Sequence, residues 1–130
     1  MDRIFLDANV LFSAAYREHS GLVEIWRLKG VRLFSSSYAI EEARRNLAAA
    51  EQRERLQHLV EALEVVETLP AARLQTTLPE KDQPILAAAV AGRATHLITG
   101  DVKHFGEFFG KVLAGVLVLP PAAYFDGRRG

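Results

Sequence analysis

Near its start the chain contains the segment Ile4-Phe5-Leu6-Asp7-Ala8-Asn9-Val10-Leu11, an apolar run that ends in an aspartate. Its apolar opening predicts a first strand over residues 3–7. Asp7 follows the apolar residues directly, so we expect it at the carboxyl end of that strand. In open α/β sheets, ligands bind outside the carboxyl ends of strands, at the point where the strand order reverses. Asp7 is therefore the first candidate site residue.

Further short apolar runs alternate with longer stretches of helical period, which is typical of a parallel sheet covered by helices. The remaining strands are predicted at Val31–Ser35, Glu64–Glu67, Thr95–Thr99 and Gly115–Leu119. Four helical stripes are predicted, formed by Leu22, Val23, Ile25 and Trp26, by Ile40, Ala43, Leu47 and Ala50, by Leu56, Leu59, Val60 and Leu63, and by Ile85, Leu86, Ala89 and Val90. The segment 68–79 is interpreted as a loop. The pattern predicts a doubly wound α/β sandwich.

Length and composition indicate one ordinary globular domain. The chain has 130 residues, 49% of them hydrophobic and 25% charged, which is enough to bury a core. No apolar stretch approaches the length that crosses a bilayer, and the first residues resemble a strand more than a signal peptide. The sequence contains no cysteine, which excludes disulfides and thiolate metal sites. We expect a cytoplasmic protein with no membrane association.

The charge balance bears on nucleic-acid binding. Sixteen basic residues balance sixteen acidic ones, so the formal net charge is zero. A tight sequence-independent nucleic-acid binder usually carries a basic excess, because phosphate contacts supply its affinity. The balance counts mildly against such a protein, although acids that hold a metal ion would act locally as part of a cationic site.

Two more aspartates extend the candidate site. Asp101 follows Leu97-Ile98-Thr99-Gly100, just past the fourth predicted strand, and faces Asp7 across one crevice if the first and fourth strands are neighbours. Asp82 opens the apolar stripe of its own helix, where a carboxylate must be hydrogen-bonded, paired or bound to a metal. The alternative for all three is helix capping, and Pro84 marks a helix start beside Asp82.

A fourth acid comes from the adjacent pair Glu41 and Glu42. At 100° per residue, Glu42 lies roughly 110° from the centre of the stripe formed by residues 40–50, and Glu41 roughly 150°. Glu42 is thus on the flank, from which a long side chain reaches inward. The alternative is a solvated pair of acids at an exposed helix start. Clustered carboxylates without cysteine favour a hard, oxygen-preferring cation, Mg²⁺ or Mn²⁺.

Four segments together resemble the PIN-domain family. The first is the strand with Asp-x-Asn at residues 4–11, and the second is Ser37-Tyr38-Ala39-Ile40-Glu41-Glu42-Ala43-Arg44. The third is Lys81-Asp82-Gln83-Pro84-Ile85-Leu86-Ala87-Ala88-Ala89, and the fourth is Leu97-Ile98-Thr99-Gly100-Asp101-Val102-Lys103-His104-Phe105-Gly106. Each motif is weak alone, but the four occur in the family's order and spacing.

The resemblance implies a single PIN-like domain over residues 1–130, a three-layer α/β/α sandwich with a central parallel sheet of four to five strands. It also implies an Mg²⁺- or Mn²⁺-dependent ribonuclease whose metal-binding and catalytic acids are Asp7, Glu42, Asp82 and Asp101. Asn9 and Thr99 would orient the carboxylates or a metal-bound water. Many PIN proteins of this size are similar to VapC toxins, which cleave RNA, dimerise and are inhibited by a small antitoxin.

Two other functions compete with this interpretation. A haloacid-dehalogenase-type phosphatase also opens with a strand and an aspartate, but its chemistry needs a second acid at the position of Asn9, and an amide cannot protonate a leaving group. A non-catalytic PIN-like module would bind only RNA or protein. Among the remaining residues, His104 lies near Asp101 and is either a substrate contact or, as is more common for a histidine in a surface turn, incidental. Trp26 is interpreted as a core residue rather than a base-stacking platform.

Overall fold

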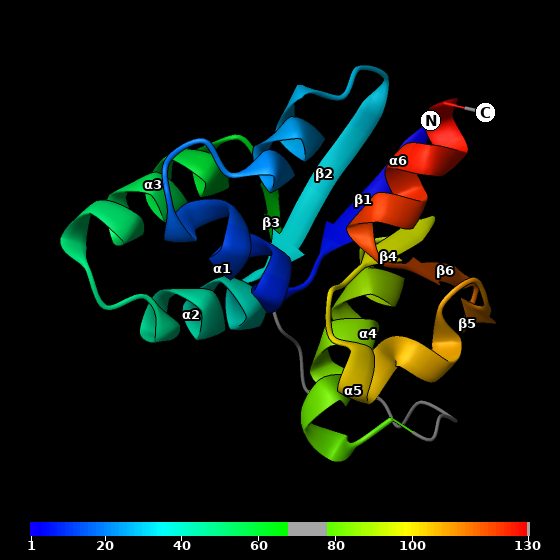
Figure 1. The fold of residues 1–130 in the computed structure, drawn as a ribbon. Helices are drawn as coiled ribbons and strands as arrows, with labels where there is room; N and C mark the ends of the chain where they lie inside the picture. Colours follow the sequence, from blue (N-terminus) through cyan, green and yellow to red (C-terminus); the bar gives the residue numbers. More distant parts are fainter. Residues whose placement is uncertain (68–77, 130) are drawn as a thin grey trace.

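Six strands form one sheet in the order β3-β2-β1-β4-β6-β5 (Figure 1). The computed structural model describes residues 1–67 and 78–129. The strands are β1 (Asp2–Leu6), β2 (Val31–Ser36), β3 (Glu64–Val66), β4 (His96–Ile98), β5 (Val112–Leu113) and β6 (Val116–Leu119). Neighbouring strands are parallel except for β5, which runs antiparallel to β6. The predicted parallel sheet is confirmed, and β5 is an edge strand that the apolar pattern did not indicate.

A tight turn explains why β5 and the start of β6 escaped prediction. Ala114 and Gly115 both have positive φ, 51° and 84°, between the two paired strands. Two consecutive residues with positive φ match the turn that best joins twisted antiparallel strands. Gly115 therefore belongs to the turn, and β6 begins at Val116 rather than at Gly115 as predicted.

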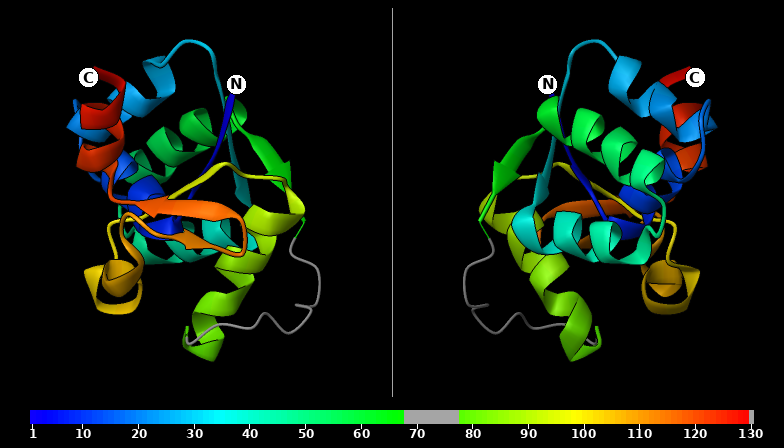
Figure 2. Two further views of the ribbon diagram at one scale, coloured as in Figure 1. Left: turned by 90° about the vertical axis from the view of Figure 1, so that its right-hand side faces the viewer. Right: turned by 90° about the vertical axis from the view of Figure 1, so that its left-hand side faces the viewer.

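Helices cover both faces of the sheet, as the sandwich requires. The helical segments are α1 (Ala8–Tyr16), η1 (Gly21–Arg27), α2 (Ser37–Asn46), α3 (Ala50–Glu61), η2 (Glu80–Asp82), α4 (Gln83–Ala91), α5 (Val102–Phe105), η3 (Gly106–Phe108) and α6 (Pro121–Arg129). Helices α1, α2 and α3 pack against one another on one side, and α4 lies on the other (Figures 1 and 2). The three-layer α/β/α arrangement is thus confirmed.

The stripe predicted over residues 40–50 is divided between two helices. Helix α2 ends at Asn46, and Leu47 adopts an extended conformation while its side chain stays fully buried. The next helix starts at Ala50, where Gln52 Oε1 accepts the amide of Ala49 at 3.1 Å, one half of a capping box. The prediction of one continuous helix was wrong. The chain leaves the helix at Leu47, whose side chain stays buried, and α3 then packs against α1.

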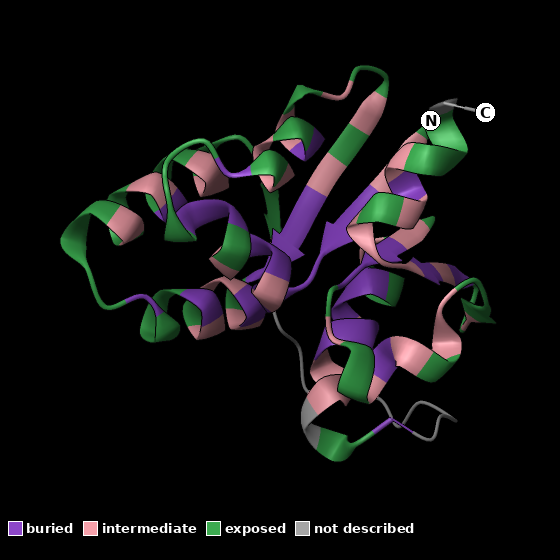
Figure 3. Cartoon of the chain, in the orientation of Figure 1, coloured by how far each residue is buried: buried purple, intermediate pink, exposed green. Residues whose placement is uncertain are grey.

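The sheet core is built by the central strands and their apolar neighbours (Figure 3). Phe5 of β1 and Phe34 of β2 are fully buried and meet edge to face, with ring centroids 5.4 Å apart. Trp26 packs against this core and donates Nε1–H to the Leu59 carbonyl, which agrees with its interpretation as a core residue.

The order of strands places its reversal between β1 and β4. From β1 the chain proceeds to β2 and β3 on one side, whereas β4 is followed by β6 and β5 on the other. Leu6 pairs with Ile98, so the first and fourth predicted strands are neighbours, as the candidate site requires. This is the point at which open α/β sheets bind ligands.

Two more predictions concern membrane-spanning helices and the loop at residues 68–79. No helix in residues 1–67 or 78–129 is long and apolar enough to cross a membrane. The loop predicted over residues 68–79 lies outside the described residues, except for Leu78 and Pro79.

Candidate functional site

Asp7 lies at the carboxyl end of β1 and is the N-cap of α1. The residue is 5% exposed, and among the described residues its side chain accepts three hydrogen bonds. Oδ1 accepts the amide of Ala8 at 2.7 Å, and Oδ2 accepts the hydroxyl of Thr99 at 2.8 Å and Nδ2 of Asn9 at 3.2 Å. Capping and a place in the site, the two alternatives for Asp7, therefore coexist in one side chain.

Burial makes Asp7 reluctant to ionise in the protein alone. Desolvation raises the pKa of Asp7 to about 6, and the nearby charges of Glu42 and Asp101 raise it further, against the lowering effect of the bonds from Thr99 and Ala8. A buried carboxylate of this kind gains from a bound cation, which replaces lost hydration and offsets the repulsion from its acidic neighbours.

Asn9 and Thr99 form the polar frame that holds Asp7. The Leu6–Ile98 pairing, extended by one residue, brings Thr99 opposite Asp7. Thr99 Oγ1 accepts the amide of Asp101 at 3.1 Å while it donates to Asp7, so one hydroxyl joins the two aspartates. Asn9 Oδ1 accepts the amide of Gly100 at 2.8 Å, which fixes the amide orientation and aims Nδ2 at Asp7 and Thr99.

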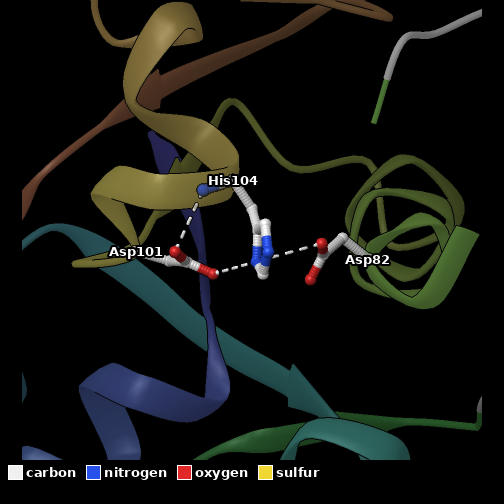
Figure 4. Close-up of side chains that lie close together, drawn as sticks. All are labelled: Asp82, Asp101 and His104. Atoms are coloured by element: carbon white, nitrogen blue, oxygen red, sulfur yellow. Dashed lines mark hydrogen bonds and ion pairs between the residues drawn. The ribbon is translucent and has the colours of Figure 1, made fainter. Parts of the chain in front are cut away.

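Asp101 and Asp82 are brought together through His104 (Figure 4). Asp101 caps α5, its Oδ1 accepting the amide of His104 at 3.1 Å. The His104 Nδ1 atom lies 2.9 Å from Asp101 Oδ2 and 3.2 Å from Asp82 Oδ2. Asp82 stands at the N-cap of α4 but makes no capping hydrogen bond to the described amides of that helix, so helix capping does not explain its position.

His104 is the site residue that sequence reasoning missed. Its side chain is 17% exposed and contacts two acids, so its interpretation as an incidental surface histidine was wrong. One signal was present in the sequence: a histidine three residues after an N-cap aspartate lies over the cap on the same helical turn. Nothing local indicates its contact with Asp82, which comes from a different element.

Glu42 and Glu41 separate as their helical angles predicted. Glu42 is half-buried and lines a pocket of about 390 Å³ formed by Asp7, Ala8, Asn9, Phe12, Glu42, Ala43 and Asn46. Glu41 is exposed and pairs with Arg44 one turn later, at 2.6 Å. Glu42 therefore faces the same pocket as Asp7, while Glu41 belongs to the solvated face.

Tyr38 is a second residue that the sequence did not single out. The pKa of its phenol is raised by burial first and then by the charges of Glu42, Asp82 and Asp7. The charges of acids from three separate elements thus all act on the phenol of Tyr38. Tyr38 is the second residue of the second motif, two residues past the end of β2 and on the first turn of α2.

The four predicted site acids form two adjoining groups rather than a single cluster. Asp82, Asp101 and His104 place one ligand atom each within 4.8 Å of one another, whereas Asp7 and Glu42 line the pocket. Thr99 links the groups by bonding both Asp7 and Asp101. The ligand atoms are mostly carboxylate oxygens, partly shielded from water and mutually repulsive, a chemistry that fits a divalent cation.

The chain is thus a doubly wound α/β/α protein with a group of acidic side chains at the point where the strand order reverses. The chain matches the PIN domain family over residues 3–103 and belongs to that family. A chain of the VapBC2 complex from Rickettsia felis, solved bound to a DNA fragment from their promoter, is similar in structure with a TM-score of 0.69. That match has 16% sequence identity and covers 91% of this chain and 98% of the other. Among curated proteins, no sequence matches.

Proposed function

We propose that this PIN domain is an endoribonuclease that depends on Mg²⁺ or Mn²⁺ and hydrolyses RNA phosphodiester bonds. The observation that carries the proposal is the convergence of Asp7 and Asp101 on Thr99 at the point where the strand order reverses. Both aspartates also cap helices, but capping does not require that they lie close to further acids, where desolvation and repulsion between carboxylates oppose their charge.

The proposed roles follow from where each side chain lies. Asp82, Asp101 and Asp7 would hold the cation, with Glu42 contributing from the pocket wall. When bound, the cation would align the phosphodiester, lower the pKa of a water and stabilise the leaving oxygen. Asn9 and Thr99 keep Asp7 in one orientation, and Phe12 and Ala43 supply apolar wall against which a nucleotide can lie.

Charge explains why cation and substrate would bind together. The acids repel a phosphodiester, and the chain has no net basic excess to offset that repulsion. A divalent cation reverses the local field and gives the RNA backbone a ligand. The activity is therefore expected to require a bound divalent cation. We expect it to take place in the cytoplasm, where RNA is available.

The test is cleavage of a single-stranded RNA by metal-free protein supplied with Mg²⁺, Mn²⁺ or excess EDTA. Wild type is expected to cut only with metal, and Asp7→Asn is expected to lose activity by at least about 100-fold while circular dichroism shows an unchanged fold. Equal cleavage by a well-folded Asp7→Asn protein would remove Asp7 from the mechanism. Metal binding without any cleavage would favour the alternative, a PIN-like module that binds RNA or protein.

We also propose that the protein is the toxin of a toxin–antitoxin pair and forms a homodimer. The support is the family together with the fold shared with a chain of the VapBC2 complex. A cognate antitoxin is expected to insert a basic segment beside Asp7 and Asp101, because arginine or lysine donors satisfy carboxylates that lack their cation.

Co-purification with the product of an adjacent gene tests the pairing, and light scattering tests the dimer. The complex is expected to weaken when Asp7 and Asp101 are both changed to alanine and when Mg²⁺ is added in excess. A complex that is unaffected by both treatments would exclude direct blockade of the site by the antitoxin.

A further inference from the structure

The arrangement around His104 differs from a purely acidic metal site. Its Nδ1 atom points between two carboxylates, 2.9 Å from Asp101 Oδ2 and 3.2 Å from Asp82 Oδ2 (Figure 4). All three side chains are largely shielded from solvent, with exposed fractions of 17% for His104, 25% for Asp101 and 14% for Asp82. The nitrogen therefore occupies the centre of the acid group rather than its edge.

The position of the ring is set by two elements. On α5, Asp101 Oδ1 accepts the backbone amide of His104, and Asp101 Oδ2 contacts Nδ1 of the imidazole, which holds the ring over the cap. From the other side, Asp82 at the start of α4 approaches the same nitrogen. The three ligand atoms are therefore contributed by two separate elements, the start of α4 and the short helix α5 with its N-cap.

The separations suit coordination of one ion. Two ligands at right angles, each about 2.1 Å from a six-coordinate cation, lie about 3.0 Å apart. The His104–Asp101 and His104–Asp82 separations of 2.9 and 3.2 Å fall on either side of this value. A cation that replaces the Nδ1 proton would contact all three atoms with small side-chain movements, the ring then carrying its proton on Nε2.

We propose that His104 is a metal ligand and that its nitrogen makes the site prefer Mn²⁺ over Mg²⁺. Imidazole nitrogen binds transition-metal ions well, whereas Mg²⁺ favours carboxylate, carbonyl and water oxygens. The inference rests on the proposed metal site, but not on RNA cleavage, because it concerns which ion is held and by which atom.

Two substitutions separate the nitrogen from the rest of the side chain. His104→Asn places an amide oxygen, also two bonds from Cβ, near the position of Nδ1 and adds no charge, so it tests nitrogen against oxygen. His104→Ala removes the ligand altogether. His58→Ala is the control, since His58 also lies near an acid, Glu61, but its side chain is 82% exposed.

The experiment uses tag-free, metal-depleted protein titrated separately with Mn²⁺ and Mg²⁺ by calorimetry, with electron spin-echo spectroscopy of the bound Mn²⁺. Wild type and His58→Ala are expected to bind Mn²⁺ at least about 10-fold more tightly than Mg²⁺ and to show modulation from a directly bound ¹⁴N nucleus. In His104→Ala and His104→Asn the modulation is expected to vanish. The Mn²⁺ preference is expected to fall by about 10-fold in His104→Asn.

The outcomes distinguish this inference from the proposed function. Wild-type protein that binds Mn²⁺ without nitrogen modulation, or keeps the modulation in well-folded His104→Asn protein, would overturn the role of His104 and leave the acidic site standing. Wild-type protein that binds neither ion would overturn both. RNA cleavage enters neither measurement, so an inactive protein still tests the metal ligand.

Discussion

The hydroxyl of Thr99 donates a 2.8 Å hydrogen bond to Asp7 Oδ2 and thereby joins the carboxyl ends of β4 and β1. Both side chains are buried, and the same hydroxyl accepts the amide of Asp101. The relationship follows from the parallel pairing of Leu6 with Ile98, which leaves the next residue of each strand side by side. The orientation of Asp7 is thus a property of the sheet rather than of the pocket alone.

Removing that hydroxyl tests its role. Thr99→Val keeps the shape but leaves Asp7 with one donor fewer, so the unfolding free energy is expected to fall by about 1–3 kcal/mol. Because the bond from Thr99 lowers the pKa of Asp7, the substitution is also expected to move that pKa upward, measured by NMR of the carboxyl carbon in metal-free protein. Thr95→Val removes a hydroxyl that bonds Arg3 and His96 rather than Asp7, so it is the control for the titration. An unchanged Asp7 titration in Thr99→Val would show that the bond does not govern the charge of Asp7.

The pH dependence of stability is expected to reveal the buried Asp7. Its pKa in the folded protein is about 6, above the ordinary value of 3.8, so protonation stabilises the native state. This contribution is complete below about pH 4 and is lost as the pH rises through 6, a change of up to about 3 kcal/mol at about 1.4 kcal/mol per pH unit.

Asp7→Asn lacks this titration, so it isolates the contribution of Asp7. Relative to wild type, the variant is expected to gain about 1–3 kcal/mol of stability between pH 4 and pH 7.5, measured by urea unfolding with EDTA present. The other titrating groups are common to both proteins and largely cancel in the difference. Parallel stability curves across this range would contradict an elevated Asp7 pKa.

The adjacent glutamates offer a matched pair for the chemistry. Glu42→Gln removes a charge from the pocket that Asp7 lines, and RNA cleavage with Mn²⁺ is expected to fall by at least about 10-fold. Glu41→Gln removes only the exposed pairing with Arg44 and is expected to leave cleavage unchanged. Equal losses in the two variants would mean that general charge, rather than placement in the pocket, controls the reaction.

Gly92 tests the core independently of the site. A Cβ at this position would lie 2.2 Å from Cε2 of Phe34, a ring that is fully buried against Phe5. Gly92→Ala is therefore expected to destabilise the fold by about 1–3 kcal/mol through overpacking, with metal affinity retained. At Gly127 an added Cβ meets no atom within 4 Å, so Gly127→Ala serves as the control in thermal unfolding. Equal stability of the two variants would show that the Phe34 ring moves aside at no cost.

The alternation of strands and helices was predictable from the sequence, because apolar periodicity is a local property that does not depend on which elements pack together. The sequence also separated Glu42 from Glu41, since the angle around a helix depends only on residue spacing. Both features appear in the structure, with Glu42 on the pocket wall and Glu41 paired to Arg44. The ends of elements were less well determined at Leu47 and Gly115, where a chain reversal and a turn with positive φ end the local pattern.

Which acids meet was not predictable from local sequence patterns, because it depends on strand order and on contacts between distant segments. The pairing of β1 with β4 brings Thr99 to Asp7, and His104 of α5 meets Asp82, which lies at the start of α4. The sequence places a histidine one turn after a capping aspartate, but it does not specify which other side chains will surround that histidine. Asp82 approaches from another helix, so that His104 Nδ1 lies between two carboxylates. Side chains of separate elements converge in this way only when the sheet brings the ends of those elements together.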